Sequence, residues 1–193
     1  MVRKASEASS GRGSLLKQCA AEARDAWEVS GLFDQTCDKI VLYVRTRYEA
    51  TELASMLDCA EYTAKSGTDA EKREVLAKWS SEKDQPYIVA TTALAEGFDY
   101  PHVRLMINVN EPESPTIFGQ EAERAGLDGK AYSLVLLPST WEAQDREEST
   151  VIGTSSSRFD IRVRKEQERR AVHKYLRSEQ CYRKSLSESL DVR

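Results

Sequence analysis

Short polar side chains follow three of the apolar runs in this 193-residue chain. Each set stands where a predicted strand gives way to a predicted helix, a position at which hydroxyls and unpaired backbone N–H groups hold phosphate oxygens. The six residues are Thr46, Arg47, Ser66, Gly67, Thr91 and Thr92. Taken singly, each is better explained as an ordinary helix cap, but their repeated order favours a phosphate-binding edge.

The elements that would position these residues are apolar runs alternating with amphipathic segments. Strands are predicted at 39–44, 61–64, 85–91, 104–110 and 131–137. Thr46 with Glu49, and Thr68 with Glu71, form capping-box patterns that begin two of the intervening helices. The alternation predicts an α/β fold, a three-layer parallel sheet with helices on both faces plus flanking helices. In such a sheet the carboxyl ends of the strands meet at one edge.

Composition divides the chain into four parts, at 1–37, 38–139, 140–157 and 158–193. The first part combines a start expected to be disordered, residues 1–14, with a packing helix over 15–33. The α/β domain, an acidic and Ser-rich linker and a charged helical stretch follow in that order. We expect the last stretch to dock through Ile161, Val172, Tyr175 and Leu176.

Bulk composition excludes several classes of protein. The net charge of −4 carries no general signature of nucleic-acid binding, so any basic footprint must be local. No run approaches 18 apolar residues and the start lacks an apolar core, so we expect neither a membrane span nor a secretory signal. The four cysteines form no CxxC pair. This spacing argues against a disulfide framework and a self-contained zinc site, and favours a nuclear or other intracellular reducing compartment.

Two motifs carry the strongest chemical signal. The first is Gly97-Phe98-Asp99, which by itself would be a turn, but Val89-Ala90-Thr91 precedes it and Pro101 and Arg104 follow. The second begins at Gln120-Glu121 and continues through Arg124-Ala125-Gly126 to Asp128-Gly129. In this order they resemble motifs V and VI of superfamily 2 helicases, closest to the RecQ type. The resemblance covers roughly residues 39–190.

The resemblance implies a RecA-like fold of the P-loop NTPase type and the role of second motor lobe in an ATP-dependent 3′–5′ DNA helicase. It assigns nucleic-acid backbone contacts to the six edge residues. It assigns nucleotide binding to Gly97, Asp99, Gln120 and Arg124. Arg124 would be the catalytic arginine, stabilising phosphoryl charge on ATP held by a partner lobe. The family's second arginine is replaced by Leu127, which places ATPase activity in doubt.

ATP and Mg²⁺ are implied only together with a first RecA-like lobe. The sequence contains no GxxxxGK[ST] loop, because no Lys-Ser or Lys-Thr pair follows Gly11-Arg12-Gly13-Ser14 at that spacing, and no strand ends in Asp-Glu. We therefore expect no ATPase activity from this chain alone, which looks like a fragment or a degenerate copy. The expected partners are single-stranded DNA or RNA and a first lobe.

Cysteine and histidine give no metal signal in the sequence. Cys181 matches the first zinc cysteine of the RecQ zinc-binding region, but the other three ligands have no counterpart. It is a vestige or a truncated ligand, and no Zn²⁺ is expected here. His102 and His173 have no ligand-type neighbours in the sequence and are predicted at the surface.

Two alternatives remain open. The chain could be a non-catalytic α/β interaction module that binds a protein through its helix over 158–187, or an RNA helicase lobe from another superfamily 2 branch. Salt-dependent binding to single-stranded DNA separates the first alternative from a helicase lobe. The ending Arg124-Ala125-Gly126-x-Asp128-Gly129 and the helix around Cys181 favour the RecQ type over the second.

Overall fold

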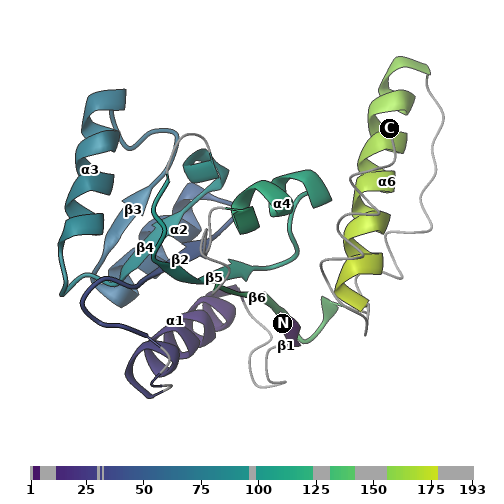
Figure 1. Cartoon of the computed structure of the whole chain (residues 1–193). Coiled ribbons are helices and arrows are strands. Elements are labelled where there is room, and N and C mark those ends of the chain that lie inside the picture. Colours follow the sequence, from purple (N-terminus) through teal and green to yellow (C-terminus); the bar gives the residue numbers. More distant parts are fainter. Residues whose placement is uncertain are drawn as a thin grey trace.

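The computed structural model describes residues 2–4, 12–29, 31, 33–95, 99–123, 131–141 and 156–177. Within them, parallel strands form a six-stranded sheet in the order β1-β6-β5-β2-β4-β3 (Figure 1). The strands are β1 (Val2–Lys4), β2 (Lys39–Tyr43), β3 (Ala60–Tyr62), β4 (Tyr87–Ala90), β5 (Val103–Val109) and β6 (Tyr132–Leu137). Every residue of β2 and of β4 is buried. Strands covered on both faces require this continuous apolar pattern.

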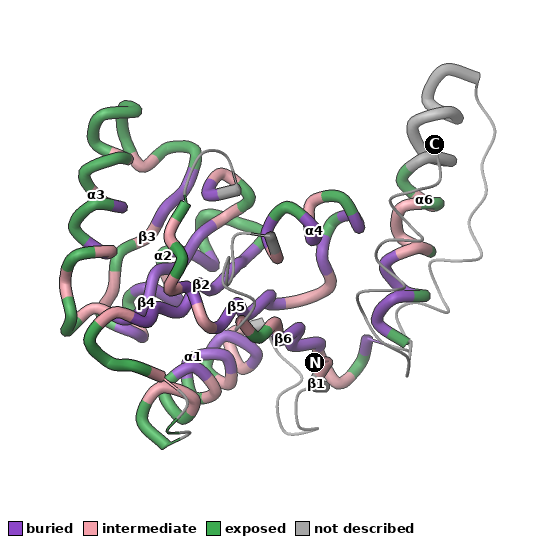
Figure 2. The backbone as a smooth tube through the Cα atoms, in the orientation of Figure 1, coloured by how far each residue is buried: buried purple, intermediate pink, exposed green. Residues whose placement is uncertain are grey.

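Helices cover both faces of the sheet. They are α1 (Arg12–Val29), α2 (Arg47–Leu57), α3 (Asp69–Ser81), the 3₁₀ turn η1 (Thr92–Ala95), α4 (Pro115–Glu123) and α6 (Ser156–Arg177). On one face α1 and α2 share a core with Ile107 of β5, whereas on the other α3, α4 and α6 pack around Met106. Figure 2 shows buried positions running along the strands between these helices. The predicted three-layer α/β architecture is confirmed.

Local hydrogen bonds begin α2 and α3 where the sequence predicts. The Thr46 hydroxyl accepts from the Glu49 N–H, and the Glu49 carboxylate accepts from the Thr46 N–H. Thr68 and Glu71 make the same reciprocal pair at α3. Both capping boxes are confirmed.

The chain start departs from the prediction of disorder over residues 1–14. Val2–Lys4 pairs with the edge strand β6, and α1 begins at Arg12. Backbone pairing to an open strand edge depends little on side-chain type. The Ser-rich composition of residues 1–14, with two glycines and three basic residues, therefore gave no sign of it.

The C-terminal part agrees with the prediction as far as it is described. α6 begins at Ser156, and Val172, Tyr175 and Leu176 are buried against the sheet domain as predicted. The Ile161 side chain, most of the predicted linker and the chain beyond Arg177 lie outside the described residues. No helix in the described part is long and apolar enough to cross a bilayer.

Candidate functional site

The loops that follow β2, β4 and β3 lie side by side, because these strands are neighbours and run parallel. Backbone bonds join their ends: Val44 N donates to Ala90 O at 2.9 Å, and Thr91 N donates to Tyr62 O at 3.1 Å. The six residues predicted to hold phosphate therefore gather along one edge, called here the carboxyl edge: Thr46, Arg47, Ser66, Gly67, Thr91 and Thr92.

At the start of α2 the hydroxyl and the carboxylate are already committed. Thr46 Oγ1 donates to Glu49 Oε2 at 2.9 Å and accepts from Glu49 N at 3.2 Å. Glu49 is buried in the first turn of α2. Its carboxylate therefore occupies the positive end of the helix, where a phosphate would otherwise be favoured. Arg47 is the exposed first residue of α2.

The start of α3 repeats this arrangement. Gly67 has φ +108°, and a Cβ at this position would lie 2.5 Å from Glu71 Oε2, so glycine is required for the turn. Hydrogen bonds from Thr68, first from its backbone N–H, lower the pKa of Glu71. Ser66 Oγ accepts from Thr63 N at 2.8 Å.

Two consequences follow for anion binding at the carboxyl edge. The glutamates of both capping boxes compete with phosphate, while the N–H groups of the first helical residues keep no intrahelical acceptor. Exposed Arg47 and Thr92, with exposed Lys65 which the sequence analysis did not single out, supply the accessible polar groups. This set suits weak contacts to a backbone rather than recognition of bases.

The structure describes only some of the residues that the helicase resemblance singles out. Gly97, Arg124, Leu127 and Cys181 lie outside the described residues. Gln120 is exposed on α4, and Asp99 is exposed just before β5. The roles assigned to these residues remain predictions.

A pocket of about 440 Å³ lies beside the carboxyl edge, between the ends of β2 and β5 and the helices α4 and α6. Asn108 Nδ2 donates to Glu121 Oε2 at 2.8 Å, and both residues are buried. Burial raises the pKa of Glu121 to about 7, against the opposing effect of the Asn108 hydrogen bond. Asn108 Oδ1 is buried and has no hydrogen-bond partner among the described residues.

Glu111 lines this pocket and contacts His173 of α6. Its Oε2 accepts from Trp141 Nε1 at 2.8 Å and lies 2.7 Å from His173 Nε2. Arg45 Nη2 donates to Glu111 O at 2.7 Å. His173 is 6% exposed, so its predicted place at the surface is wrong. The sequence could not show this, because 62 positions separate His173 from Glu111.

His102 lies at the surface as predicted, with its side chain 41% exposed, but the expectation that it has no ligand-type neighbours is wrong. Its Nδ1 lies 3.6 Å from Asp38 Oδ1, and Cys37 completes a group of ligand-type atoms. These residues lie at the other edge of the sheet, where β2 and β5 begin.

Asn108 and Glu121 are the polar groups of the pocket that the sequence analysis passed over. Asn108 was visible as a polar residue in the apolar run 104–110, and Glu121 is next to Gln120. Neither position carries the phosphate loop or the Mg²⁺ acids that ATP requires. The described residues of this pocket therefore do not fit ATP and Mg²⁺ by themselves.

The model of the helicase conserved C-terminal domain matches residues 27–129. This match spans more than half of the chain, so the chain belongs to the helicase C-terminal domain family, as a lobe of a superfamily 2 helicase.

Relatives come from both DNA and RNA helicases. The chain is 32% identical to the RecQ-like DNA helicase BLM of Xenopus laevis over 106 residues, covering 53% of this chain and 8% of that protein. It is 27% identical to eukaryotic initiation factor 4A of Cryptosporidium parvum over 114 residues, covering 55% of this chain and 28% of that protein. Each match spans only a minor part of its relative.

The fold is similar to that of Mss116p DEAD-box helicase domain 2, solved with an RNA duplex. The TM-score is 0.59 at 13% identity, over 97% of this chain and 83% of that one. At this identity the likeness supports the RecA-like fold alone.

Proposed function

We propose that the chain is the second motor lobe of a RecQ-type 3′–5′ DNA helicase, which binds the backbone of a single strand and contributes motifs V and VI. The observation that carries this proposal is the alignment of three polar loops along the carboxyl edge of one parallel sheet. A strand lying along that edge would meet Arg47 and the first N–H groups of α2, then Thr92, and then the first N–H groups of α3.

The chemistry of the carboxyl edge sets the expected affinity. Glu49 and Glu71 already occupy the helix starts, and the net charge is −4. Few cations are then left to neutralise phosphates and displace the counterions of the nucleic acid, so binding should be weak, insensitive to base sequence and only shallowly dependent on salt.

An RNA helicase lobe is the second candidate. The similarity to eukaryotic initiation factor 4A favours it. Backbone contacts alone do not separate DNA from RNA, because that distinction needs a contact to the 2′-hydroxyl.

Fluorescence anisotropy with labelled oligonucleotides tests the interface. We expect Arg47→Glu to weaken binding of poly-pyrimidine and mixed single strands alike at low salt, and Lys83→Glu to leave it unchanged. Lys83 is an equally exposed cation in the turn after α3, at the opposite edge. Equal affinity for Arg47→Glu and the unaltered chain would refute the proposed path. Running DNA and RNA strands of one sequence in parallel decides between the two candidates.

Phosphate release tests the motor assignment separately. The chain alone should hydrolyse no ATP, with or without DNA, because it carries no phosphate loop. Mixed with an intact first lobe, it should stay slow until Leu127→Arg restores the second arginine, since an arginine finger contributes about 10³–10⁵ in rate. Full activity without that substitution would show that the arginine is dispensable.

A further inference from the structure

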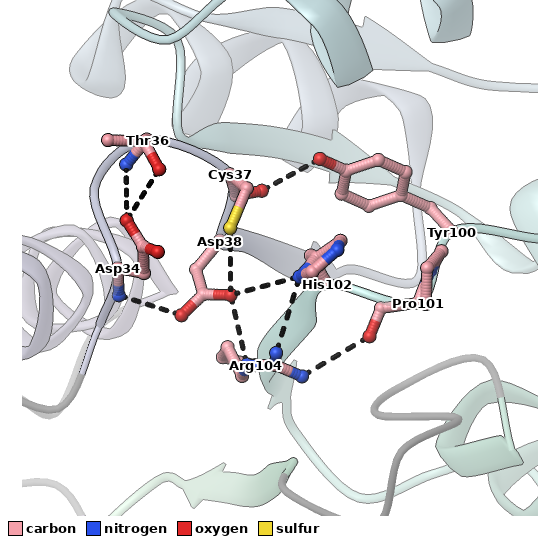
Figure 3. Close-up of polar contacts among 8 residues, drawn as sticks. All are labelled: Asp34, Thr36, Cys37, Asp38, Tyr100, Pro101, His102 and Arg104. Atoms are coloured by element: carbon pink, nitrogen blue, oxygen red, sulfur yellow. Dashed lines mark hydrogen bonds and ion pairs between the residues drawn. The ribbon is translucent and has the colours of Figure 1, made fainter.

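A second polar group lies at the edge where β2 and β5 begin, called here the amino edge (Figure 3). Cys37 and Asp38 directly precede β2, and His102 directly precedes β5. The two strands pair in parallel, and Lys39 N donates to His102 O at 2.9 Å. Residues 65 positions apart in the sequence are thereby fixed against each other.

We propose that Cys37, Asp38 and His102 form a binding site for Zn²⁺ or a similar late first-row divalent cation. A thiolate, an imidazole and a carboxylate are the three donor types that zinc takes in proteins, and sites with three protein ligands keep a fourth position for water. The sulfur ligand disfavours Mg²⁺ and Ca²⁺, which prefer oxygen alone. None of the three residues belongs to the helicase motifs.

The distances between the donor atoms fit tetrahedral coordination. Bonds of about 2.0–2.3 Å at tetrahedral angles require about 3.4 Å between nitrogen and oxygen and about 3.6 Å between sulfur and oxygen. The structure has 3.6 Å from His102 Nδ1 to Asp38 Oδ1 and 3.8 Å from Cys37 Sγ to Asp38 Oδ1. All three donor atoms lie within 4.8 Å of one another. Small side-chain rotations would close the site.

Neighbouring groups hold the ligands in place, as outer partners do in metal sites. Asp38 is buried, and its Oδ2 accepts from Asp34 N at 2.8 Å. Arg104 Nε contacts Asp38 Oδ1 at 2.9 Å. The Tyr100 hydroxyl donates to Cys37 O at 2.8 Å, which fixes the backbone of the thiol ligand. Figure 3 shows the contacts of Asp34 and Arg104 meeting at Asp38, and the Tyr100 contact ending on the Cys37 carbonyl.

Arg104 opposes a cation by its charge and by a contact of its Nη2 with His102 Nδ1 at 3.3 Å. Metal binding replaces that contact, while Arg104 keeps Asp38 and the carbonyl of Pro101. The His102 side chain is 41% exposed and has room to turn. Burial and the neighbouring carboxylates of Asp34 and Asp38 raise the pKa of the Cys37 thiol, so a bound cation would have to displace its proton. The thiolate and the two carboxylates would then supply three negative charges against one guanidinium.

A bound ion would link the loop before β2 to the loop before β5. These are the two central strands of the sheet. Because the ion would bind the folded chain only, the stability of the lobe would rise with the logarithm of the free ion concentration once that exceeds the dissociation constant.

A Co²⁺ titration of the reduced, chelator-treated full chain tests the site. Co²⁺ in place of zinc should give a near-ultraviolet thiolate-to-metal band and the intense visible bands of tetrahedral coordination. Added Zn²⁺ should abolish both and raise the melting temperature. No thiolate band at a tenfold excess of Co²⁺ would overturn the proposal.

Variants assign the ligands. Cys37→Ser should remove the thiolate band, and His102→Gln should weaken Co²⁺ binding at least tenfold. Both positions are partly exposed, so folding should be retained, which circular dichroism checks. Cys59→Ser, at a cysteine of similar exposure, and Cys181→Ser, at the residue matching a RecQ zinc ligand, should keep the band. A band that survives Cys37→Ser, or disappears with Cys181→Ser, would refute the site.

Discussion

At the amino edge of the sheet the charged side chains of Asp38 and Lys39 are buried and paired, whereas at the carboxyl edge most of the six phosphate-type residues are exposed. Asp38 and Lys39 are 4% and 2% exposed, and Lys39 Nζ donates to the carbonyls of Glu82 and Gln85. Burial lowers the pKa of Lys39. Arg47 and Thr92, in contrast, face solvent.

The difference separates two uses of polar residues. A buried charge costs free energy unless it is paired, so the amino edge holds its loops in one arrangement. An exposed hydroxyl or guanidinium contributes little to folding and stays available to a ligand. Substitutions at the amino edge should therefore reduce stability, and those at the carboxyl edge should reduce binding.

The largest effect is expected for Asp38→Ala. It leaves the Arg104 guanidinium, whose side chain is 12% exposed, without its carboxylate. Removing one partner of a buried ion pair costs about 3–5 kcal/mol, measured here as the free energy of unfolding in urea with a chelator present. Asp84→Ala, at an exposed turn, should stay within about 0.5 kcal/mol. A loss below about 1 kcal/mol for Asp38→Ala would remove the contrast between the edges.

The next effect concerns Glu121, whose pKa burial raises from 4.5 to about 7. Between these values the folded chain binds a proton that the unfolded chain has released, so stability falls as the pH rises through this window. Glu121→Gln should flatten this fall in stability. The difference in the free energy of unfolding between the variant and the unaltered chain should therefore shift in favour of the variant by about 3 kcal/mol from pH 4 to above pH 7. Unfolding in urea from pH 4 to 8 measures it. Glu113→Gln removes an exposed neighbouring charge that adds to the raised pKa of Glu121, so it should shift the fall to lower pH without abolishing it.

His173→Ala tests the attachment of α6. Loss of the part-buried contact to Glu111 should cost about 2 kcal/mol, since hydrogen bonds to charged groups contribute about 1.5–3 kcal/mol. Trp141 packs against the His173 ring with centroids 4.9 Å apart, so its fluorescence should change as well. Lys174→Ala, at the exposed next residue, should change neither. Unchanged stability of His173→Ala would mean that α6 is held by its apolar contacts alone.

The smallest effect belongs to the carboxyl edge. Thr68→Ala removes the capping box of α3 and should cost about 1 kcal/mol. Arg47→Glu should leave the free energy of unfolding within about 0.5 kcal/mol while it weakens binding of single strands. Ser81→Ala, at the other end of α3, is the control for the helix. A stability loss for Arg47→Glu as large as that of Thr68→Ala would show that Arg47 is structural.

Short-range patterns in the sequence determined most of the architecture. Continuous apolar runs predicted β2 and β4, because strands covered on both faces leave no polar position. The capping boxes at Thr46 and Thr68 were predicted from residues three positions apart, since their bonds close within one helical turn. Parallel strands then fixed the common edge of the six phosphate-type residues.

The tertiary structure alone decided which distant residues meet. His173 reaches Glu111, His102 reaches Cys37 and Asp38, and Val2–Lys4 pairs with β6, all through contacts with no local signal. The strand order places β5 beside β2, although β3 and β4 lie between them in the chain. Strand order is set by how the helices pack on the two faces of the sheet, so the amino edge and its three ligand-type side chains emerge only in the folded chain.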